Sequence, residues 1–171
     1  DIQLDIHSSV QPVELSTQKS DIVVRLVRPE KGNYKIKKAG EIKFGFYAHN
    51  EYLACKGKPY SIAEMHGHKF IDWGLDFYFL TMSLWLDEVY ADRAPWLRLN
   101  SFTSQLIAAE KGLGIAVLPC FAANQAGLIP LLEDIPPLNM DLWLLVHEKL
   151  DNTPRVKIVK NILASLLSRE I

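Results

Sequence analysis

The chain has 171 residues, 49% of them hydrophobic, and its 19 lysines and arginines stand against 20 acidic residues. This is enough to bury a hydrophobic core in one domain or in two small lobes. Because neither charge forms a long block and no apolar run approaches the ~20 residues of a membrane helix, the sequence argues against a broad nucleic-acid-binding surface and a membrane span.

The first part of the chain predicts strands separated by short connections. Alternating apolar and polar residues favour a half-buried strand, and a continuous β-branched run favours a strand covered on both faces, as in a parallel sheet. In order, we predict a strand at 2–6, a weakly helical segment at 12–19, the β-branched strand at 21–25, a loop at 28–40, a strand at 42–48, a turn into a short helix at 49–54, and a turn capped by Ser61 at 59–66.

The second part continues the alternation of strands and helices. In order, we predict a strand at 69–73, a helix at 85–92, a strand at 96–99, a helix after Asn100, strands at 115–118 and 128–132, a linker at 134–137, a strand at 141–147, and a helix capped by Thr153 with Pro154 in its first turn. The last helix carries an apolar stripe of Val156, Val159, Ile162, Leu163, Leu166 and Leu167. This alternation indicates an α/β architecture with mostly parallel strands.

The segment 100–119 is the most informative, because it predicts a short helix, a glycine stop and a fully apolar strand. Asn100 or Ser101 can accept hydrogen bonds from the first free N–H groups of the helix, and Gly112 can supply a left-handed residue at its end. A helix N-terminus carries a partial positive charge and unpaired donors, so it can hold a carboxylate or another small anion. We therefore expect a binding cleft in front of this helix.

Four segments, in order, resemble the effector-binding domain of LysR-type transcriptional regulators. They are Asp21-Ile-Val-Val-Arg25, Gly112-Leu-Gly-Ile-Ala-Val-Leu-Pro119, Leu142-Trp-Leu-Leu-Val-His147, and Arg155-Val156 with the helix that follows. Each segment is of moderate specificity, but four in order over nearly the whole chain are hard to obtain by chance. The resemblance implies an α/β fold of two Rossmann-like lobes joined by two crossovers, as in type 2 periplasmic binding proteins.

The resemblance also implies a domain organisation. Lobe I would comprise residues 1–48 and 139–171, and lobe II residues 49–138. Lobe I would lack its opening strand and helix, and the N-terminal helix-turn-helix domain that contacts promoter DNA would be absent, so we expect the chain to be part of a longer cytoplasmic protein. A homo-oligomer is expected, with a dimer formed through the sensing domains and a tetramer as the alternative in the full protein.

By the same resemblance, a small effector, expected to bear a carboxylate, binds between the lobes. The effector-binding residues would be Ser8, Ser9, Arg25, Asn100, Ser101, Phe102 and Thr103. Hydroxyl groups, an arginine fork and free helix N–H groups that converge on a crevice can hold a carboxylate. Two alternatives stay open: Arg25 can instead pair with a surface acid, and Ser101 can act as a helix cap with or without touching a ligand.

Other candidate chemistry is weaker. His66 and His68 have no third ligand at metal-binding spacing, which favours a loop, and Cys55 and Cys120 have the isolated spacing of reduced thiols. We expect no metal, no cofactor and no catalysis, because no nucleophile elbow, phosphate loop or dinucleotide motif is present. The aromatic residues expected in the core, or on a pocket wall or subunit contact, are Trp73, Phe77, Tyr78, Phe79, Trp85 and Trp96.

The expected function is therefore ligand sensing for a bacterial LysR-type regulator, in which the effector shifts the relative orientation of the lobes. One rival is a solute-binding protein of a transport system with the same fold, which would carry an export signal and a complete first lobe. The other rival is an enzyme on a binding-protein scaffold, which perturbed carboxylates or a nucleophile facing the cleft would favour.

Overall fold

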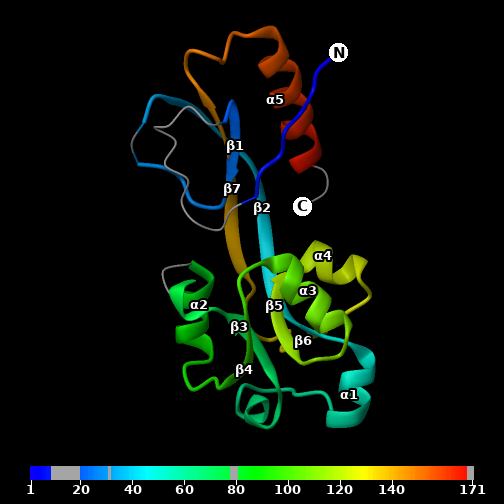
Figure 1. The fold of residues 1–171 in the computed structure, drawn as a ribbon. Coiled ribbons are helices and arrows are strands. Elements are labelled where there is room, and N and C mark those ends of the chain that lie inside the picture. The colour runs from blue at the N-terminus through cyan, green and yellow to red at the C-terminus, as the bar shows by residue number, and fades with distance from the viewer. Residues whose placement is uncertain (9–19, 31, 78–80, 169–171) are drawn as a thin grey trace. The chain divides into compact units, whose positions relative to one another are not determined.

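The computed structural model describes residues 1–8, 20–30, 32–77 and 81–168. The chain divides into two compact units: unit 1 comprises Asp1–Ile42 and Asn139–Ile171, and unit 2 comprises Lys43–Leu138. Whether these units act as the two predicted lobes stays a prediction. The elements, shown in Figure 1, are β1 (Ile22–Arg25), β2 (Tyr34–Ala48), α1 (Asn50–Lys56), η2 (Ala63–Gly67), β3 (Phe70–Trp73), η3 (Leu75–Phe77), α2 (Thr81–Val89), β4 (Pro95–Leu99), α3 (Phe102–Glu110), β5 (Ile115–Pro119), α4 (Cys120–Gln125), β6 (Ile129–Leu131), β7 (Leu138–His147) and α5 (Pro154–Leu167).

Unit 1 is built on β1, β7 and β2, which are neighbours in that order, together with α5. β1 pairs with β7 in antiparallel orientation, so that Ile22 lies opposite Val146 and Arg25 opposite Trp143. The predicted strand at 21–25 is confirmed, but its predicted setting in a parallel sheet with both faces covered is wrong. β-branched residues favour a strand in either setting, so the run could not distinguish an antiparallel edge strand from a central one.

β2 begins at Tyr34, where the sequence predicted a loop over 28–40. Tyr34 and Ile36 are half-buried while Lys35 and Lys37 are exposed, which is the alternation of a half-buried strand. The high lysine and glycine content of the segment concealed this pattern. The strand continues to Ala48, so the predicted strand at 42–48 is confirmed as its second half.

Residues 1–8 form no strand, and their side chains, including Ile2, Leu4 and Ile6, are exposed. The predicted strand at 2–6 is therefore wrong. Alternation produces a strand only where a neighbouring strand satisfies its backbone hydrogen bonds, and none of the described strands pairs with this segment. The weakly helical segment predicted at 12–19 lies outside the described residues.

α5 starts where the sequence predicted, with Thr153 at the N-cap and Pro154 in the first turn. The side chain of Thr153 makes no capping hydrogen bond, so its predicted role as a side-chain cap is wrong. Val156 is buried, but Ile162 and Leu166, which were expected on the buried stripe, are exposed. The apolar stripe of α5 is wider than the surface that the described part of unit 1 offers it.

Unit 2 contains a mixed sheet in the order β2-β5-β3-β4, with β6 also paired with β2. β3 is parallel to both β4 and β5, whereas β2 is antiparallel to β5 and β6. The predicted strands at 69–73, 96–99, 115–118 and 128–132 are thus confirmed. The expectation of mostly parallel strands is wrong for the sheet as a whole, because only the β3-β4 and β3-β5 pairs are parallel, whereas β1-β7, β2-β5 and β2-β6 are antiparallel. β5 is buried along its whole length, as a strand covered on both faces should be.

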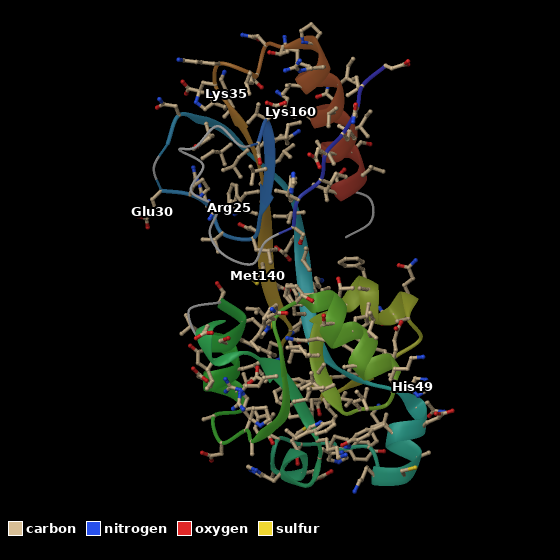
Figure 2. All side chains as sticks on the ribbon, viewed as in Figure 1. Arg25, Glu30, Lys35, His49, Met140 and Lys160 are labelled. Atoms are coloured by element: carbon tan, nitrogen blue, oxygen red, sulfur yellow. The ribbon has the colours of Figure 1, made fainter. Side chains whose placement is uncertain are left out.

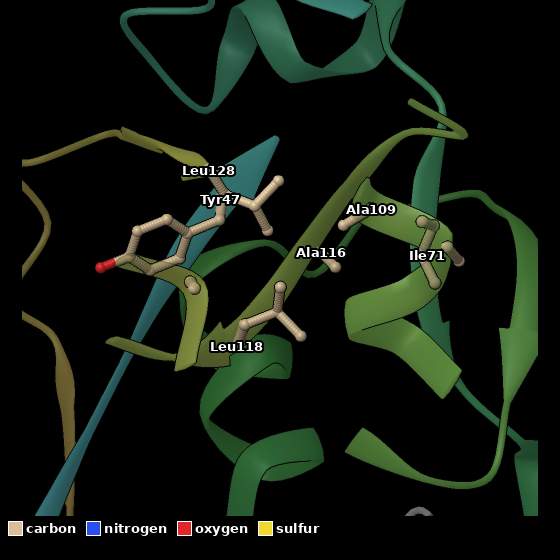
Figure 3. Packing of buried hydrophobic residues seen from close by; sticks show 8 residues of the cluster. Tyr47, Ile71, Ala109, Ala116, Leu118 and Leu128 are labelled. Carbon is tan, nitrogen blue, oxygen red and sulfur yellow. The ribbon is translucent and has the colours of Figure 1, made fainter. Parts of the chain in front are cut away.

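Helices cover both faces of the unit 2 sheet (Figure 1). Alternate residues of a strand point to opposite faces, and Phe46 packs against Trp85 of α2 with ring centroids 5.5 Å apart. The neighbouring Tyr47 instead belongs to a cluster with Ala109 of α3 and Leu118 of β5 (Figure 3). Small residues such as Ala109 and Ala116 in this cluster let α3 lie close to the sheet, which fixes the position of its N-terminus.

Two glycines control the connection from α3 to β5. Gly112 has a φ of 66°, the left-handed conformation predicted for the end of the helix. Gly114 lies against β3, where a Cβ atom would be only 2.4 Å from the backbone oxygen of Lys69. That oxygen accepts a hydrogen bond from the Ile115 N–H at 2.9 Å. The Gly-x-Gly sequence therefore ends a helix and brings two strands together.

None of the helices in the described part of the chain combines the length and the apolar character that crossing a membrane requires.

Candidate functional site

The best-defined candidate site is the N-terminus of α3. Ser101 is the N-cap: its Oγ accepts a hydrogen bond from the Ser104 N–H at 3.2 Å and lies 2.8 Å from Ser104 Oγ. Of the two caps that the sequence allowed, Ser101 takes the role, and Asn100 is an exposed residue before it. Because the first N–H groups of a helix have no intrahelical partner, Phe102 and Thr103 present backbone donors at this end.

The side chains around this helix end have different roles. The ring of Phe102 packs 4.8 Å from Trp73 and 5.3 Å from Phe44, measured between ring centroids, so the side chain anchors α3 to the sheet. Thr103 is exposed. The expected contribution of Phe102 to effector binding is thus limited to its backbone, whereas Thr103 has both an N–H and a hydroxyl group to offer.

Arg25 is the last residue of β1 in unit 1, where it is half-buried (Figure 2). Among the described residues it has no ion-pair partner, so the alternative of an arginine paired with a surface acid finds no support there. Ser8 is exposed in the same unit, and Ser9 lies outside the described residues. The structure groups Asn100, Ser101, Phe102 and Thr103 in unit 2, and the association of that group with Ser8 and Arg25 stays a prediction.

Gln105 is a polar residue of α3 that sequence reasoning missed. Its side chain is 1% exposed, and its Nε2 has no hydrogen-bond partner among the described residues. Gln105 stands three and four residues before Ala108 and Ala109, on the helix face that packs on the sheet. The helical spacing of Gln105 from Ala108 and Ala109 could have predicted a buried position, but polar side chains are not expected in a core.

His66 and His68 both contact tyrosine side chains. The Tyr52 hydroxyl lies 3.2 Å from Nδ1 of His68, and burial, with a contribution from Lys56, lowers the pKa of His68 below its ordinary value. The rings of His66 and Tyr90 pack edge to face, with their centroids 5.7 Å apart. In the described ranges no group of three or more His, Cys, Asp or Glu side chains is placed to hold a metal ion, and Cys55 is a free thiol.

Cys120 is also a free thiol, and it adjoins the hydroxyl group of Tyr47. Burial, and then the hydrogen bond with Cys120, raise the pKa of Tyr47 well above its ordinary value. At neutral pH the phenol is therefore protonated. Tyr47 belongs to the hydrophobic cluster of unit 2, and Cys120 packs against that cluster.

Trp96 is not a core residue, although the core was one of the positions expected for the aromatic residues. Trp73 is buried, but Trp96 is 48% exposed, because β4 is the edge strand and Trp96 points away from the core face. Its Nε1 donates to the Leu113 carbonyl at 3.0 Å, and Lys69 Nζ lies 4.3 Å from the ring centroid. Of the other aromatic residues in the predicted set, Tyr78 and Phe79 lie outside the described part of the chain.

Comparison with known proteins places these features in a family. Residues 1–168 match the family model described as "LysR substrate binding domain". The Mau operon transcriptional activator of Paracoccus denitrificans is 23% identical over 176 residues, which cover 100% of this chain and 57% of that protein. The chain thus spans little more than half the length of this relative.

Solved structures show the same fold. The regulatory domain of CrgA, a LysR-type transcriptional regulator from Neisseria meningitidis, superimposes with a TM-score of 0.79 and 21% identity, covering 94% of this chain and 81% of that one. The CcmR regulatory domain from Synechocystis PCC6803, solved in complex with 2-PG, gives a TM-score of 0.68 and 15% identity over 90% of this chain and 76% of that one. The predicted α/β fold of the type 2 periplasmic-binding-protein kind is confirmed by these likenesses.

Proposed function

Because this chain belongs to the LysR substrate binding domain family, we propose that it is the part of a bacterial transcriptional regulator that binds a small-molecule effector. The observation that carries the proposal is the family match, which extends over residues 1–168 and so over nearly all of the chain. The relative in Paracoccus denitrificans is a transcriptional activator, which favours this role over that of a solute-binding protein for transport. In this role the domain binds its ligand without turning it over.

The effector is an anion, and a carboxylate suits the candidate groups best. The first turn of α3 offers the N–H groups of Phe102 and Thr103 at the positive end of the helix, capped by Ser101. Arg25 offers a planar guanidinium without an ion-pair partner in the described residues, and such a group can bind a carboxylate through two hydrogen bonds. We keep as proposals that the effector binds between the lobes, that Ser8, Ser9 and Asn100 line its site, and that these groups act on one effector molecule.

The effector acts by shifting a conformational equilibrium. A ligand changes the populations of two states only by the difference between its affinities for them, and a change from 1:99 to 99:1 requires about 10⁴-fold preference. The full-length protein is proposed to be a cytoplasmic homo-oligomer that contacts promoter DNA through a separate N-terminal domain. The effector then changes how the oligomer presents those DNA-binding domains.

Isothermal titration calorimetry with a panel of mono- and dicarboxylates, inorganic phosphate and 2-PG tests the proposal. We expect at least one anion to bind with saturation and Arg25→Gln to weaken it by about tenfold or more, which is the typical effect of removing a hydrogen bond to a charged group. Arg155→Gln, an exposed arginine on α5 of the same unit, is the matched control. If Arg25→Gln and Arg155→Gln bind equally well, Arg25 is not in the effector site.

A further inference from the structure

Unit 2 contains a cavity of about 230 Å³ that the effector-binding proposal does not use. It is bounded by the end of β3, by α2 and by β4, and among its lining residues are Asp72, Asp87, Arg93 and Arg98. All of the lining residues that the structure describes belong to unit 2. The ion pairs among these two acidic and two basic side chains determine which charged groups a ligand can reach.

Three of the four charges form a fixed network centred on Arg93. Its Nε donates to Asp72 Oδ2 at 2.7 Å, one terminal nitrogen bonds Asp87 Oδ1 at 2.7 Å, and the other donates to the Tyr90 carbonyl at 3.2 Å. The Arg93 side chain is only 12% exposed. Although burial acts to lower it, the carboxylates of Asp72 and Asp87 hold the pKa of Arg93 above its ordinary value, so this guanidinium stays charged.

Arg98 and the second carboxylate oxygen of Asp87 lie outside this network. Both carboxylate oxygens of Asp72 are engaged, because Oδ1 accepts the Trp73 N–H at 2.8 Å and Oδ2 is bound to Arg93. Asp87 is 60% exposed and uses only Oδ1 in the network. Arg98 lies opposite Asp72 in the β3-β4 register, its side chain is exposed, and it has no ion-pair partner in the described part of the chain.

We propose that this cavity binds a small zwitterion of the α-amino acid class, with the ligand carboxylate on the guanidinium of Arg98 and the ligand ammonium on Oδ2 of Asp87. The four charges of the cavity sum to zero, so a simple anion would be opposed by the two carboxylates and a simple cation by the two guanidinium groups. A ligand that carries both charges matches Arg98 and the second oxygen of Asp87, whose Oδ1 is bound to Arg93. The inference does not depend on the effector-binding proposal, because it uses no residue of that site.

The size and the apolar part of the cavity limit the ligand further. Drug-sized ligands occupy pockets of about 300–1,000 Å³, and this cavity, at about 230 Å³, is smaller. Leu75, which is 76% exposed, and Pro95 line the cavity beside the charged groups. They offer apolar contact to a side chain on the ligand, so the structure favours an amino acid with a short apolar side chain over glycine or a long charged one.

Thermal unfolding of the 171-residue chain with each of the twenty common L-amino acids at 10 mM is the first test. A ligand that binds only the folded state raises the unfolding midpoint in proportion to the logarithm of its concentration over Kd. We expect small apolar amino acids to raise the midpoint, and the rise to grow with the logarithm of their concentration. For the amino acid with the largest effect, the N-acetyl derivative lacks the ammonium and the carboxamide lacks the carboxylate, and each should bind at least tenfold more weakly in calorimetry.

Variants locate the site. Arg98→Gln and Asp87→Asn should each weaken amino acid binding at least tenfold, whereas Glu88→Gln, an exposed carboxylate on the same helix, should not change it. The unfolding midpoints without ligand check that each variant is folded. The inference is overturned if no amino acid shifts the midpoint, if Arg98→Gln binds as tightly as the unaltered chain, or if the carboxamide binds as well as the amino acid. Loss of binding in Arg25→Gln together with retention in Arg98→Gln would also overturn it, by assigning the amino acid to the effector site.

Discussion

Replacement of Gly114 by alanine should destabilise the chain more than any other substitution of a glycine by alanine in the connection from α3 to β5. A Cβ atom at Gly114 would lie 2.4 Å from the Lys69 oxygen and 3.1 Å from the Lys69 carbonyl carbon. Both are backbone atoms of the segment that enters β3, so no side-chain rotation relieves the contact. The strands must separate locally.

The size of the effect follows from the geometry. Ordinary van der Waals contact begins near 3.4 Å, and therefore the approach of 2.4 Å demands a displacement of about 1 Å. This displacement would break the hydrogen bond from the Ile115 N–H to Lys69 O, worth about 1 kcal/mol. Strain from overpacking adds about 1–3 kcal/mol. We expect a loss of about 2–4 kcal/mol of unfolding free energy, and a fall of about 5–15 °C in the unfolding midpoint.

Urea denaturation followed by circular dichroism measures this loss, and Gly127→Ala is the matched control. Gly127 has a φ of 70°, but a Cβ there would meet nothing within 4 Å. Its replacement carries only the conformational cost of a left-handed residue with a side chain, about 1–2 kcal/mol. If Gly114→Ala is no less stable than Gly127→Ala, the contact between a Cβ atom at position 114 and the Lys69 oxygen does not lower stability, and the reasoning fails.

Three further predictions concern polar side chains of unit 2. Gln105→Leu removes a buried donor that has no partner in the described residues. In urea denaturation it should raise the free energy of unfolding by about 1 kcal/mol. A loss of stability would mean that Gln105 has a partner, such as a bound water. Arg93→Leu leaves the carboxylate of Asp72 buried and should cost about 3–5 kcal/mol in the same assay, whereas a cost below 1 kcal/mol would contradict a buried pair. Since burial and Lys56 lower the pKa of His68 from 6.5, folding disfavours its protonated form, so stability should fall as pH drops below about 6.5. The fall in urea midpoint between pH 7.5 and pH 5 should be smaller in His68→Gln, and an equal fall in both proteins would remove His68 as a cause.

The segment 100–119 was predictable because its determinants are local. A serine before a helix, a glycine in the left-handed conformation after it and a short apolar run each act over a few residues, and Ser101, Gly112 and β5 take those roles in the structure. The same holds for β3 and β4. Where the signal is local, sequence and structure agree to within about two residues.

The errors at residues 2–6 and on α5 have a common physical origin. The apolar pattern of each segment says only which side chains would gain from burial, and a neighbouring surface must exist to bury them. The described part of unit 1 supplies no strand beside residues 1–8 and does not cover Ile162 or Leu166. The apolar pattern therefore identified the side chains that would gain from burial, but it could not show whether a neighbouring surface is present to bury them.

The charged cavity of unit 2 could not be predicted from the sequence, because it depends on contacts between distant parts of the chain. Asp72 and Arg93 are 21 positions apart in sequence, and they meet only because α2 returns the chain to the end of β3. Nothing in the local sequence distinguishes Arg93 from an exposed loop arginine. Register was also needed, since the position of Arg98 beside Asp72 depends on the pairing of β3 with β4.

Arg25 and Arg98 offer the same charge and the same donors, but their surroundings select different ligands. Arg98 shares its cavity with two carboxylates, so a ligand there must carry a positive group as well as a negative one. Arg25 has no acidic partner in the described residues, so an anion needs no compensating charge beside it. Arg25→Gln should therefore weaken a carboxylate effector and spare an amino acid, and Arg98→Gln should do the reverse. If one variant weakened both ligands equally, one site would bind both, and the assignment of two sites would be wrong.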